Sequence, residues 1–479
     1  MYNEKNFITI RCPQCGKLVK VALGNYAYKC GACEFMFTIK FKSDANTDTE
    51  KAKQPVGPQI PEDVLLKVDH LCQYFRMGNR DLKAVDNVSF EVKKGEVFGL
   101  VGESGCGKTT TGRSIIKLYD ITSGNVYFKG ERVGAGTRSY YDAIKNARLL
   151  AAKRYKQLKK DLKADPSRAE EINAELAELN ESVANVVAEN KKHIREARSS
   201  DRAVNKKHAD RLLQELEAEY APKLAAVAGD KKETKRIQKE LDSKRRVAKR
   251  SRLITQIQMI FQDPIASLDP RMTVREIIAE GLIINGIRDK KYIDEKVYEI
   301  LEMVGLVREH ADRYPHEFSG GQRQRIGIAR AVIMQPEMII ADEPISALDV
   351  SIQAQVINLL NDLRERLGLT ILFIAHDLSV VKYFSDRIGV MYFGKMVELA
   401  SSDDLFKNPL HPYTRSLLSA IPLPDPNYEK QRVRVTYNPI AEHDYSKNLP
   451  SMREVAPGHF VYCNDEEEAK YKQQLEQTN

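Results

Sequence analysis

The sequence predicts an α/β nucleotide-binding fold with two additions, and three observations carry this prediction. An apolar stretch, Val97–Val101, runs into a glycine-rich loop followed by a helical stretch, the order expected where a strand enters a phosphate-binding loop. A charged segment with helical periodicity, residues 131–252, interrupts this domain, and two CxxC pairs precede it. With 479 residues, 42% hydrophobic and 30% charged, the chain exceeds one ordinary domain and is too apolar for a disordered protein.

The first 42 residues are predicted to form a zinc ribbon. Fourteen residues separate the pair Cys12 and Cys15 from the pair Cys30 and Cys33, and two such turns facing each other offer four thiolates in tetrahedral geometry. Four cysteines close the coordination sphere, so the Zn²⁺ is expected to be structural, although iron would also fit. Residues 43–61, rich in polar residues and proline, are predicted to be a linker.

A phosphate-binding loop with the pattern GxxxxGK[ST] begins at Gly102. Its glycines allow successive N–H groups to face phosphate, Lys108 can bridge the β- and γ-phosphates of ATP, and the Thr109 hydroxyl can ligate Mg²⁺. Cys106, beside a helix N-terminus, is expected to have a lowered pKa if it is more than a passive loop residue. The predicted nucleotide contacts here are Gly102, Ser104, Gly105, Cys106, Gly107, Lys108, Thr109 and Thr110.

The insertion, residues 131–252, is predicted to be a helical hairpin or small coiled coil. A heptad of mostly apolar residues steps through it: Ile172, Leu176, Leu179, Val183, Val186, Asn190 and Ile194. Pro166, Pro222 and Gly229 are expected to divide it into three or four helices. Residues 131–255 contain 31 basic and 20 acidic residues, a net +11, against +8 for the whole chain. Its basic runs suit anionic lipid or RNA, although solvated helix faces are the plainer interpretation.

Further motifs follow the insertion in a fixed order: Ile257–Pro264, Phe318–Arg325, Met338–Pro344, Ser346–Asp349 and Ile374–Asp377. Together with the phosphate-binding loop they resemble the Walker A, Q-loop, signature, Walker B, D-loop and switch histidine of ABC-type ATPases. The resemblance implies an ABC nucleotide-binding domain with a helical subdomain, spanning residues 62–130 and 253–425.

The same resemblance assigns roles to the residues that match it. Asp342 would ligate Mg²⁺, and the adjacent Glu343 would polarise the attacking water. His376 would hold the γ-phosphate, and Gln262 would touch Mg²⁺ and water while facing a membrane partner. The catalytic set is therefore predicted to be Glu343, His376 and Gln262, and the Mg²⁺ ligands Thr109, Gln262 and Asp342.

In this family the signature segment serves the nucleotide of the opposite subunit, which implies a homo- or heterodimer with ATP between the subunits. The residues that the resemblance assigns to this role are Ser319, Gly320, Gly321, Gln322 and Asp349. Phe75 lies where the family stacks an aromatic ring on adenine. Its neighbour Tyr74 is an alternative, and a structural aromatic is the plainer interpretation.

Within the family, residues 258–264, 266–273, 349–356 and 411–414 are similar to the oligopeptide/dipeptide importer ATPases, closest to the F-type subunit. The resemblance implies a D-type ATPase partner, two membrane permeases, an external solute-binding protein and a C-terminal extension over residues 426–479. The expected function is to power uptake of oligopeptides, dipeptides or related solutes such as nickel complexes by hydrolysing ATP.

No stretch approaches the about 20 apolar residues of a membrane span, and no secretory signal begins the chain. We therefore expect a peripheral protein at the cytoplasmic face of the membrane. Coiled coils and zinc sites also occur in ABC-type ATPases of nucleic-acid maintenance, which makes a soluble protein of that kind the alternative. The last residues, 466–479, are predicted to form a frayed helix.

Overall fold

The computed structural model describes residues 7–11, 18–22, 27–29, 36–38, 60–78, 80–227, 229–421, 435–445 and 448–478. The chain divides into two compact units, Met1–Gln59 and Ile60–Asn479. In the first unit β1 (Phe7–Arg11) pairs antiparallel with β2 (Leu18–Ala22), and β3 (Ala27–Lys29) pairs antiparallel with β4 (Met36–Thr38). The four cysteines predicted to bind zinc and residues 43–59 of the predicted linker lie outside the described residues.

An eight-stranded sheet, in the order β10-β11-β12-β7-β13-β14-β16-β15, forms the centre of the second unit. Its strands are β7 (Val97–Val101), β10 (Ile257–Ile260), β11 (Met338–Asp342), β12 (Thr370–Ala375), β13 (Arg387–Tyr392), β14 (Lys395–Ser401), β15 (Ser451–Ala456) and β16 (His459–Cys463). The first five in the order run parallel and the last three antiparallel. Strands β7, β11 and β12 are buried at every residue, as their uninterrupted apolar sequences require.

The direction of the parallel strands positions the site. Strands β10, β11, β12 and β7 run the same way, so the segments after their carboxyl ends meet at one edge of the sheet. Those segments contain Gln262, Glu343, His376 and the phosphate-binding loop, which are far apart in the sequence. α1 (Lys108–Ile115) follows the loop directly.

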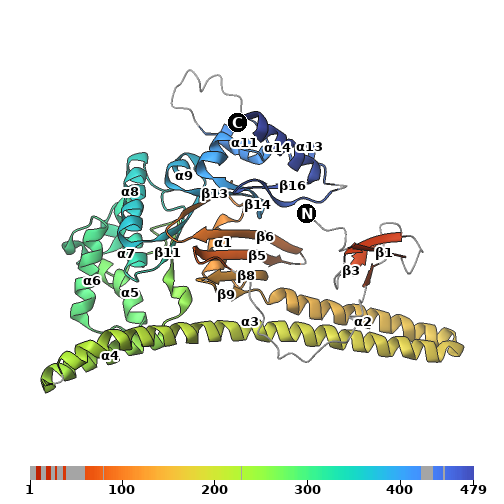
Figure 1. The fold of residues 1–479 in the computed structure, drawn as a ribbon, viewed down its shortest axis with the longest axis horizontal. Helices are drawn as coiled ribbons and strands as arrows, with labels where there is room; N and C mark the ends of the chain where they lie inside the picture. The colour runs from red at the N-terminus through yellow and green to blue at the C-terminus, as the bar shows by residue number, and fades with distance from the viewer. Residues whose placement is uncertain are drawn as a thin grey trace. The chain divides into compact units, whose positions relative to one another are not determined.

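A four-stranded antiparallel sheet, in the order β6-β5-β8-β9, forms a separate layer (Figure 1). Its strands are β5 (Val64–Met77), β6 (Arg80–Lys93), β8 (Ser123–Phe128) and β9 (Glu131–Ala135). The apolar residues that alternate along β5 and β6 contribute to one core with residues of the central sheet such as Phe98 and Leu372.

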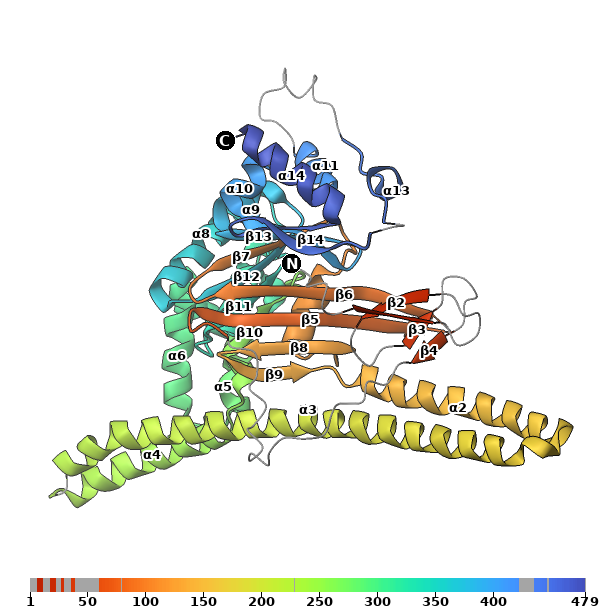
Figure 2. The ribbon, with the colours of Figure 1, turned by 45° about the vertical axis from the view of Figure 1, so that its right-hand side comes forward.

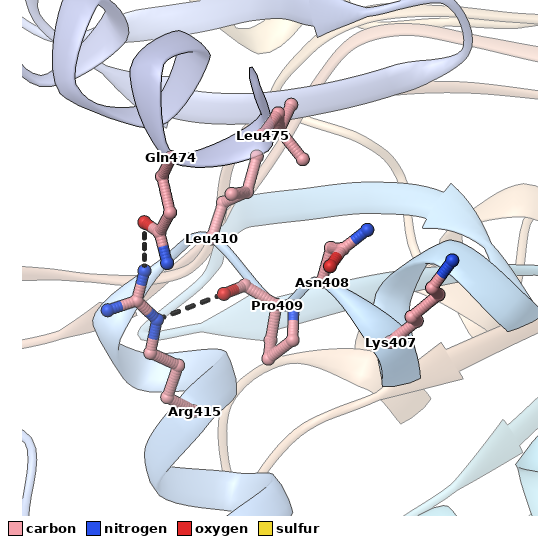
Figure 3. Close-up of a pocket in the computed structure, with 7 residues that line it drawn as sticks. All are labelled: Lys407, Asn408, Pro409, Leu410, Arg415, Gln474 and Leu475. Carbon is pink, nitrogen blue, oxygen red and sulfur yellow. Dashed lines mark hydrogen bonds between the residues drawn. The ribbon is translucent and has the colours of Figure 1, made fainter. Parts of the chain in front are cut away.

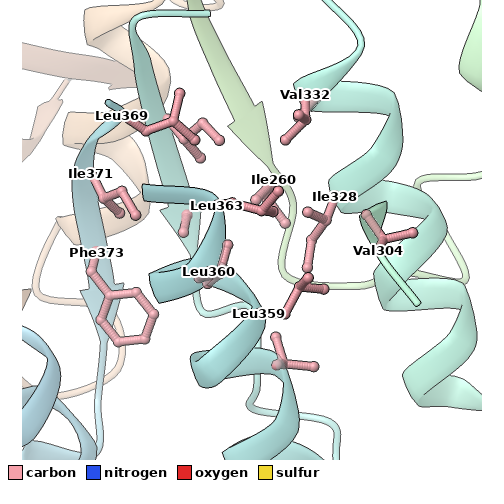
Figure 4. Close-up of a cluster of buried hydrophobic side chains, with 14 of the residues drawn as sticks. Ile260, Val304, Ile328, Val332, Leu359, Leu360, Leu363, Leu369, Ile371 and Phe373 are labelled. Carbon is pink, nitrogen blue, oxygen red and sulfur yellow. The ribbon is translucent and has the colours of Figure 1, made fainter. Parts of the chain in front are cut away.

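Helices form a second core with the other face of the central sheet. They are α5 (Val274–Ile284), α6 (Lys290–Met303), α7 (Gly320–Val332), α8 (Val350–Leu367), α9 (Leu378–Phe384), α10 (Ser402–Lys407) and α11 (Pro412–Ser419), with the 3-10 turns η4 (Arg308–Asp312) and η5 (Pro315–Glu317). Helices α5 and α6 pack on α7, and the turn η3 (Leu253–Gln256) belongs to the core shared with the antiparallel sheet. Figure 4 shows leucines of α8 and Ile328 and Val332 of α7 packed with Ile371 and Phe373 of β12. This core holds the strand ends in place.

The insertion forms three helices: α2 (Arg138–Ala164), α3 (Ala169–Ala226) and α4 (Lys231–Arg250), with the turn η2 (Pro166–Arg168) after α2. Helices α2 and α4 both pack along α3 (Figures 1 and 2). Breaks occur near Pro166 and Gly229, as predicted, but Pro222 lies inside α3. The prediction that Pro222 divides the insertion was wrong, because one missing N–H close to a helix end does not stop the helix.

Helix α3 is fixed to the ATPase domain near its middle. The Arg132 guanidinium of β9 donates to the Ser200 hydroxyl at 3.1 Å and to the Glu196 carbonyl at 3.3 Å. The Leu253 N–H donates to Asn205 Oδ1 at 3.2 Å, and Val204 is buried with the core. Both ends of α3, with α2 and α4 alongside, extend beyond these contacts (Figure 2).

The C-terminal residues form α13 (Pro439–Glu442), the pair β15–β16 and α14 (Asp465–Thr478). The prediction of a frayed terminal helix was wrong, because Tyr471 and Glu467 of α14 are buried and Arg415 of α11 donates to Gln474 at 2.7 Å. Among the described residues, no helix combines the length and apolar character needed to cross a membrane.

Candidate nucleotide site

The phosphate-binding loop has the backbone shape that its sequence predicts. Gly102 and Gly107 have φ values of 147° and 109°, which side chains on other residues disfavour. A Cβ on Gly102 would stand 2.2 Å from the Met391 carbonyl oxygen, and one on Gly107 would stand 2.2 Å from that of Ala84. Both positions therefore require glycine for close packing as well as for conformation. Ser104, Gly105 and Thr110 lie in the same loop and first turn.

Lys108 is folded into the loop and is only 3% exposed. Its Nζ donates to the carbonyl oxygens of Gly102 at 2.7 Å and Glu103 at 3.0 Å, and lies 4.0 Å from Glu343 Oε1. A buried ammonium group hydrogen-bonded to neutral carbonyls interacts more favourably with an anion that replaces those carbonyls, because hydrogen bonds between two charged groups are stronger. The lysine therefore suits a phosphate-binding role.

The Thr109 hydroxyl donates to Asp342 Oδ1 at 2.7 Å. Asp342 ends β11 and is fully buried, and its Oδ2 has no hydrogen-bond partner, with only Arg113 Nη2 at 4.0 Å. Burial raises the pKa of the Asp342 carboxyl group despite the Thr109 bond and the nearby Arg113. A buried carboxylate oxygen without a partner, beside a threonine hydroxyl, is a donor set that fits Mg²⁺.

Three predicted catalytic residues meet at one carboxylate. Gln262 Nε2 donates to Glu343 Oε2 at 2.8 Å, and His376 Nδ1 lies 3.3 Å from the same oxygen. Glu343 also has a φ of 45°, an uncommon conformation for a residue with a side chain, and its N–H is held by the Ile374 carbonyl at 2.9 Å. The strand ends thus bring together Gln262, Glu343 and His376, as the sequence predicts, beside Lys108.

The raised pKa of Cys106 agrees with its prediction as a passive loop residue and contradicts the alternative of a lowered pKa. Its thiol is buried, and this burial raises the pKa of Cys106, with Lys108 only partly opposing the shift. Loss of hydration outweighs the helix N-terminus, so the thiol is protonated at neutral pH.

The predicted signature residues lie apart from the phosphate-binding loop. Ser319 caps α7, and a capping box joins it to Gln322, with Gly320 and Gly321 in the first turn. Asp349 precedes α8 and is exposed. Among the hydrogen bonds and ion pairs of the described residues, none joins these five residues to the phosphate-binding loop. Their N–H groups at the start of α7 form an anion-binding end that is open on the surface.

The two candidate aromatics differ in their contacts. The Tyr74 hydroxyl donates to Asp86 Oδ1, while the Phe75 ring packs edge-on against Tyr119 with centroids 5.2 Å apart. Burial and the Asp86 bond raise the pKa of Tyr74. The Tyr74 side chain is therefore held by its hydrogen bond to Asp86 of β6. The half-buried Phe75 is the better candidate for a stacking contact.

The sequence did not single out one contact of the loop. The Glu103 N–H donates to the hydroxyl of Tyr413, 310 residues away on α11, at 3.0 Å. Tyr413 belongs to the segment His411–Thr414, which resembled a family motif but carried no assigned role. A single hydrogen bond between two distant segments produces no repeating pattern in the sequence, so only the tertiary structure shows this contact.

A pocket of about 330 Å³ lies away from these residues, between the end of α10 and α14 (Figure 3). It is lined by Lys407, Asn408, Pro409, Leu410, Arg415, Gln474 and Leu475. The Arg415 guanidinium joins its two sides by donating to the Pro409 carbonyl and to Gln474. The pocket marks the place where α14 docks, not the nucleotide site.

The parallel sheet, its phosphate-binding loop and the carboxylates at the strand ends define a P-loop ATPase of the ABC class. A family model described as ABC transporter matches residues 85–223 and 212–346, and one described as oligopeptide/dipeptide transporter, C-terminal region, matches residues 397–447. The chain belongs to the ABC transporter ATP-binding subunits of the oligopeptide/dipeptide family.

Three curated relatives carry that assignment. The oligopeptide transport ATP-binding protein OppF of Bacillus subtilis is 46% identical over 404 residues, which cover 84% of this chain and 97% of the relative. AmiF of Streptococcus pneumoniae, another oligopeptide transport ATP-binding protein, is 40% identical over 412 residues, which cover 86% of this chain and 98% of the relative. The dipeptide transport ATP-binding protein DppF of Lactococcus lactis is 40% identical over 412 residues, which cover 85% of this chain and 96% of the relative.

Proposed function

We propose that this protein is the ATP-hydrolysing subunit of an importer that takes up oligopeptides, dipeptides or related solutes such as nickel complexes. The observation that carries the proposal is the meeting of Gln262 and His376 at the Glu343 carboxylate, beside Lys108. The printed functions of the three relatives support the peptide substrates.

In this proposal each residue has a defined task. Glu343 accepts a proton from the attacking water, which Gln262 also contacts, and His376 holds the γ-phosphate beside the Glu343 carboxylate. Lys108 leaves its two carbonyl partners to contact the β- and γ-phosphates, as loop N–H groups of Gly105, Gly107 and Thr110 do. Thr109, Gln262 and Asp342 would hold Mg²⁺, which supplies charge neutralisation on the phosphates.

The open anion-binding end at α7 suggests a second subunit. Ser319, Gly320, Gly321 and Gln322, with Asp349, would face nucleotide bound by the partner, and Phe75 would stack on adenine. We propose a heterodimer with a D-type ATPase under two membrane permeases, fed by an external solute-binding protein. The protein would then be peripheral, at the cytoplasmic face of the membrane.

Capture of the assembled transporter tests this proposal. A tagged Glu343→Gln form, purified with Mg-ATP from gently solubilised membranes, should retain ATP and bring with it two multispanning permeases and a second ATPase. Lys108→Ala is the matched control, because it keeps Glu343 and removes the phosphate contact. Recovery of soluble proteins or nucleic acid without permeases would overturn the proposal.

The two additions remain predictions of the sequence. We propose a zinc ribbon over residues 1–42, with Cys12, Cys15, Cys30 and Cys33 as ligands, joined through residues 43–61 to the ATPase domain at 62–130 and 253–425. We propose a coiled-coil packing for the insertion at 131–252 and a family-type extension at 426–479. The double variant Cys12→Ser/Cys15→Ser tests the ribbon: it should lose about one equivalent of zinc by atomic spectroscopy, and unchanged zinc content would contradict the ligand set.

The alternative, an ATPase of nucleic-acid maintenance, is not favoured. The relatives named above are all transport ATP-binding proteins, and the match at residues 397–447 is to a transporter C-terminal region.

A further inference from the structure

Two helices of the insertion carry exposed cations without acidic partners. On α2 these are Lys145, Arg148, Lys153, Lys156, Lys159, Lys160 and Lys163; on α3 they are Lys191, Arg195, Arg198, Arg202 and Lys206. Within the described part of the chain, no ion pair joins any of them to a carboxylate. We call these twelve residues the cationic face.

Helical periodicity places the members of the cationic face together. On α3 they are spaced by four, three, four and four residues, which keeps them on one side of a helix. The residues through which α3 contacts β9, Glu196, Ser200 and Lys207, lie on the other side. The α3 part of the cationic face therefore points away from β9, and all five of its side chains are exposed.

A contact between the two helices makes the two parts continuous. The Arg198 guanidinium of α3 lies 6.0 Å from the centre of the Tyr141 ring on α2. Tyr141 is on the same side of α2 as Lys145, Arg148 and Lys159, by the same spacing rule.

Apolar side chains are exposed among these cations. Leu149 is 53% exposed and stands four residues from Lys145 on one side and from Lys153 on the other. Tyr141 and Tyr155 are also exposed. A helix face that mixes lysines with exposed leucine and tyrosine suits the boundary between lipid headgroups and acyl chains, whereas a nucleic-acid backbone would require only the charges.

From this arrangement we propose that the cationic face binds the surface of an anionic phospholipid bilayer. The inference rests on the proposed function, because a transporter subunit works beside such a surface. Helix α2 has 27 residues and so extends along about 40 Å of it, presenting lysines throughout that length. Attraction of this kind decreases as salt screens the charges.

Vesicle flotation with the full chain tests the proposal without permeases. The wild type should bind vesicles containing phosphatidylglycerol, but not pure phosphatidylcholine, and should release them as salt rises. Lys153→Gln/Lys156→Gln/Lys160→Gln should lose affinity on the order of 100-fold, at roughly fivefold for each charge. Lys94→Gln/Lys290→Gln/Lys291→Gln, which neutralises three exposed lysines elsewhere, is the matched control and should bind normally.

A second variant separates lipid from other polyanions. Leu149→Asn should weaken vesicle binding severalfold, while Ile440→Asn, at an exposed apolar residue outside the insertion, should not. Equal binding to neutral vesicles, an unaffected triple variant, or charge-dependent binding of duplex RNA without binding of vesicles would each overturn the proposal. ATPase activity and permease capture are separate readouts, so failure here leaves the proposed transport function intact.

An independent observation concerns Tyr413. Its hydroxyl accepts the Glu103 N–H, while Lys108 donates to the Glu103 carbonyl at 3.0 Å, so the two peptide groups on either side of the Glu103 Cα are both held. Tyr413 is itself held firmly: the His411 ring caps α11 by accepting the Tyr413 N–H at 3.1 Å, and the buried Glu398 accepts the His411 N–H at 3.0 Å. Burial raises the pKa of Tyr413, so its hydroxyl remains protonated.

We infer that Tyr413 is a positioning residue that keeps the phosphate-binding loop in shape when Lys108 moves to a phosphate. Tyr413→Phe should raise the KM for ATP about three- to tenfold, the range expected for one hydrogen bond, with kcat changed less than twofold. Tyr437→Phe is the matched control, because its ring packs 5.6 Å from that of Tyr413 without a hydrogen bond to the loop in the described residues. An unchanged KM, or an equal change in the control, would refute the role.

Discussion

The ATPase domain and the helical insertion are built on different physical terms. In the domain, strands β7, β11 and β12 are buried at every residue, and the site depends on contacts between segments hundreds of residues apart. In the insertion, most side chains of α3 are exposed or half-buried, and its buried residues, such as Ile172 and Ile194, form a narrow row. The nucleotide site therefore depends on the densely packed ATPase domain, whereas the insertion needs only helices paired along a narrow apolar row to form its long exposed surface.

The largest expected effect tests the packed region at its reaction centre. Glu343→Gln should lower kcat for ATP hydrolysis by about 10²–10⁴-fold, because the amide cannot accept a proton from water. The amide can still accept from Gln262, so the loop and ATP affinity should be preserved. Steady-state hydrolysis and equilibrium nucleotide binding measure the two effects, and hydrolysis at the wild-type rate would remove Glu343 from its role.

A matched pair of core substitutions compares the two regions directly. Ile371→Ala in β12 should lower the free energy of unfolding by about 2–5 kcal/mol, since the residue is fully buried in a rigid core. Ile172→Ala in α3 should instead speed hydrogen exchange in α2 and the start of α3, with ATPase activity within twofold of wild type.

Thermal unfolding, hydrogen exchange and ATP hydrolysis are the measurements for this pair. The comparison fails if Ile172→Ala lowers activity as much as Ile371→Ala, because the insertion and the domain would then unfold as one cooperative unit.

A smaller effect is expected at Asp342. Burial raises the pKa of its carboxyl group, so the folded protein binds a proton more tightly than the unfolded chain. The stability from this residue is fully present below the unfolded pKa of about 3.9 and is lost as the pH rises through the folded pKa. Without nucleotide or Mg²⁺ at pH 8, Asp342→Asn should therefore raise the Tm measurably, while abolishing Mg²⁺-dependent hydrolysis.

Melting curves at several pH values measure this effect. The Tm difference between Asp342→Asn and the wild type should shrink towards pH 4. A variant that melts below the wild type at pH 8 would show that the ionised carboxylate stabilises the empty site.

The smallest effect concerns the end of the insertion. Pro222→Ala restores an N–H to α3 near its C-terminus and should slow hydrogen exchange of α3 next to α4, with no change in ATP hydrolysis. Faster exchange at that end would mean that the proline is needed for the packing of α4.

Many of the helices, strands and site residues of both regions could be predicted from the sequence. The phosphate-binding loop, Asp342, Glu343 and His376 follow apolar strands, so local pattern predicted their elements and resemblance predicted their roles. Local rules failed where packing decided the outcome. Pro222 lies inside a helix, and Asp465–Thr478 form a docked helix where a frayed one was predicted. Burial raises the pKa of Cys106, although its position at a helix N-terminus suggested the opposite.

The sequence by itself determined the order of strands and helices, the glycines of the loop and the cationic periodicity of the insertion, because each depends on neighbours a few residues apart. Only the tertiary structure decided that Gln262 and His376 contact one carboxylate oxygen, that Asp342 Oδ2 is left without a partner, and that Tyr413 holds the loop. Such contacts join distant segments, and they depend on how the sheet and its helices exclude water from the space between them.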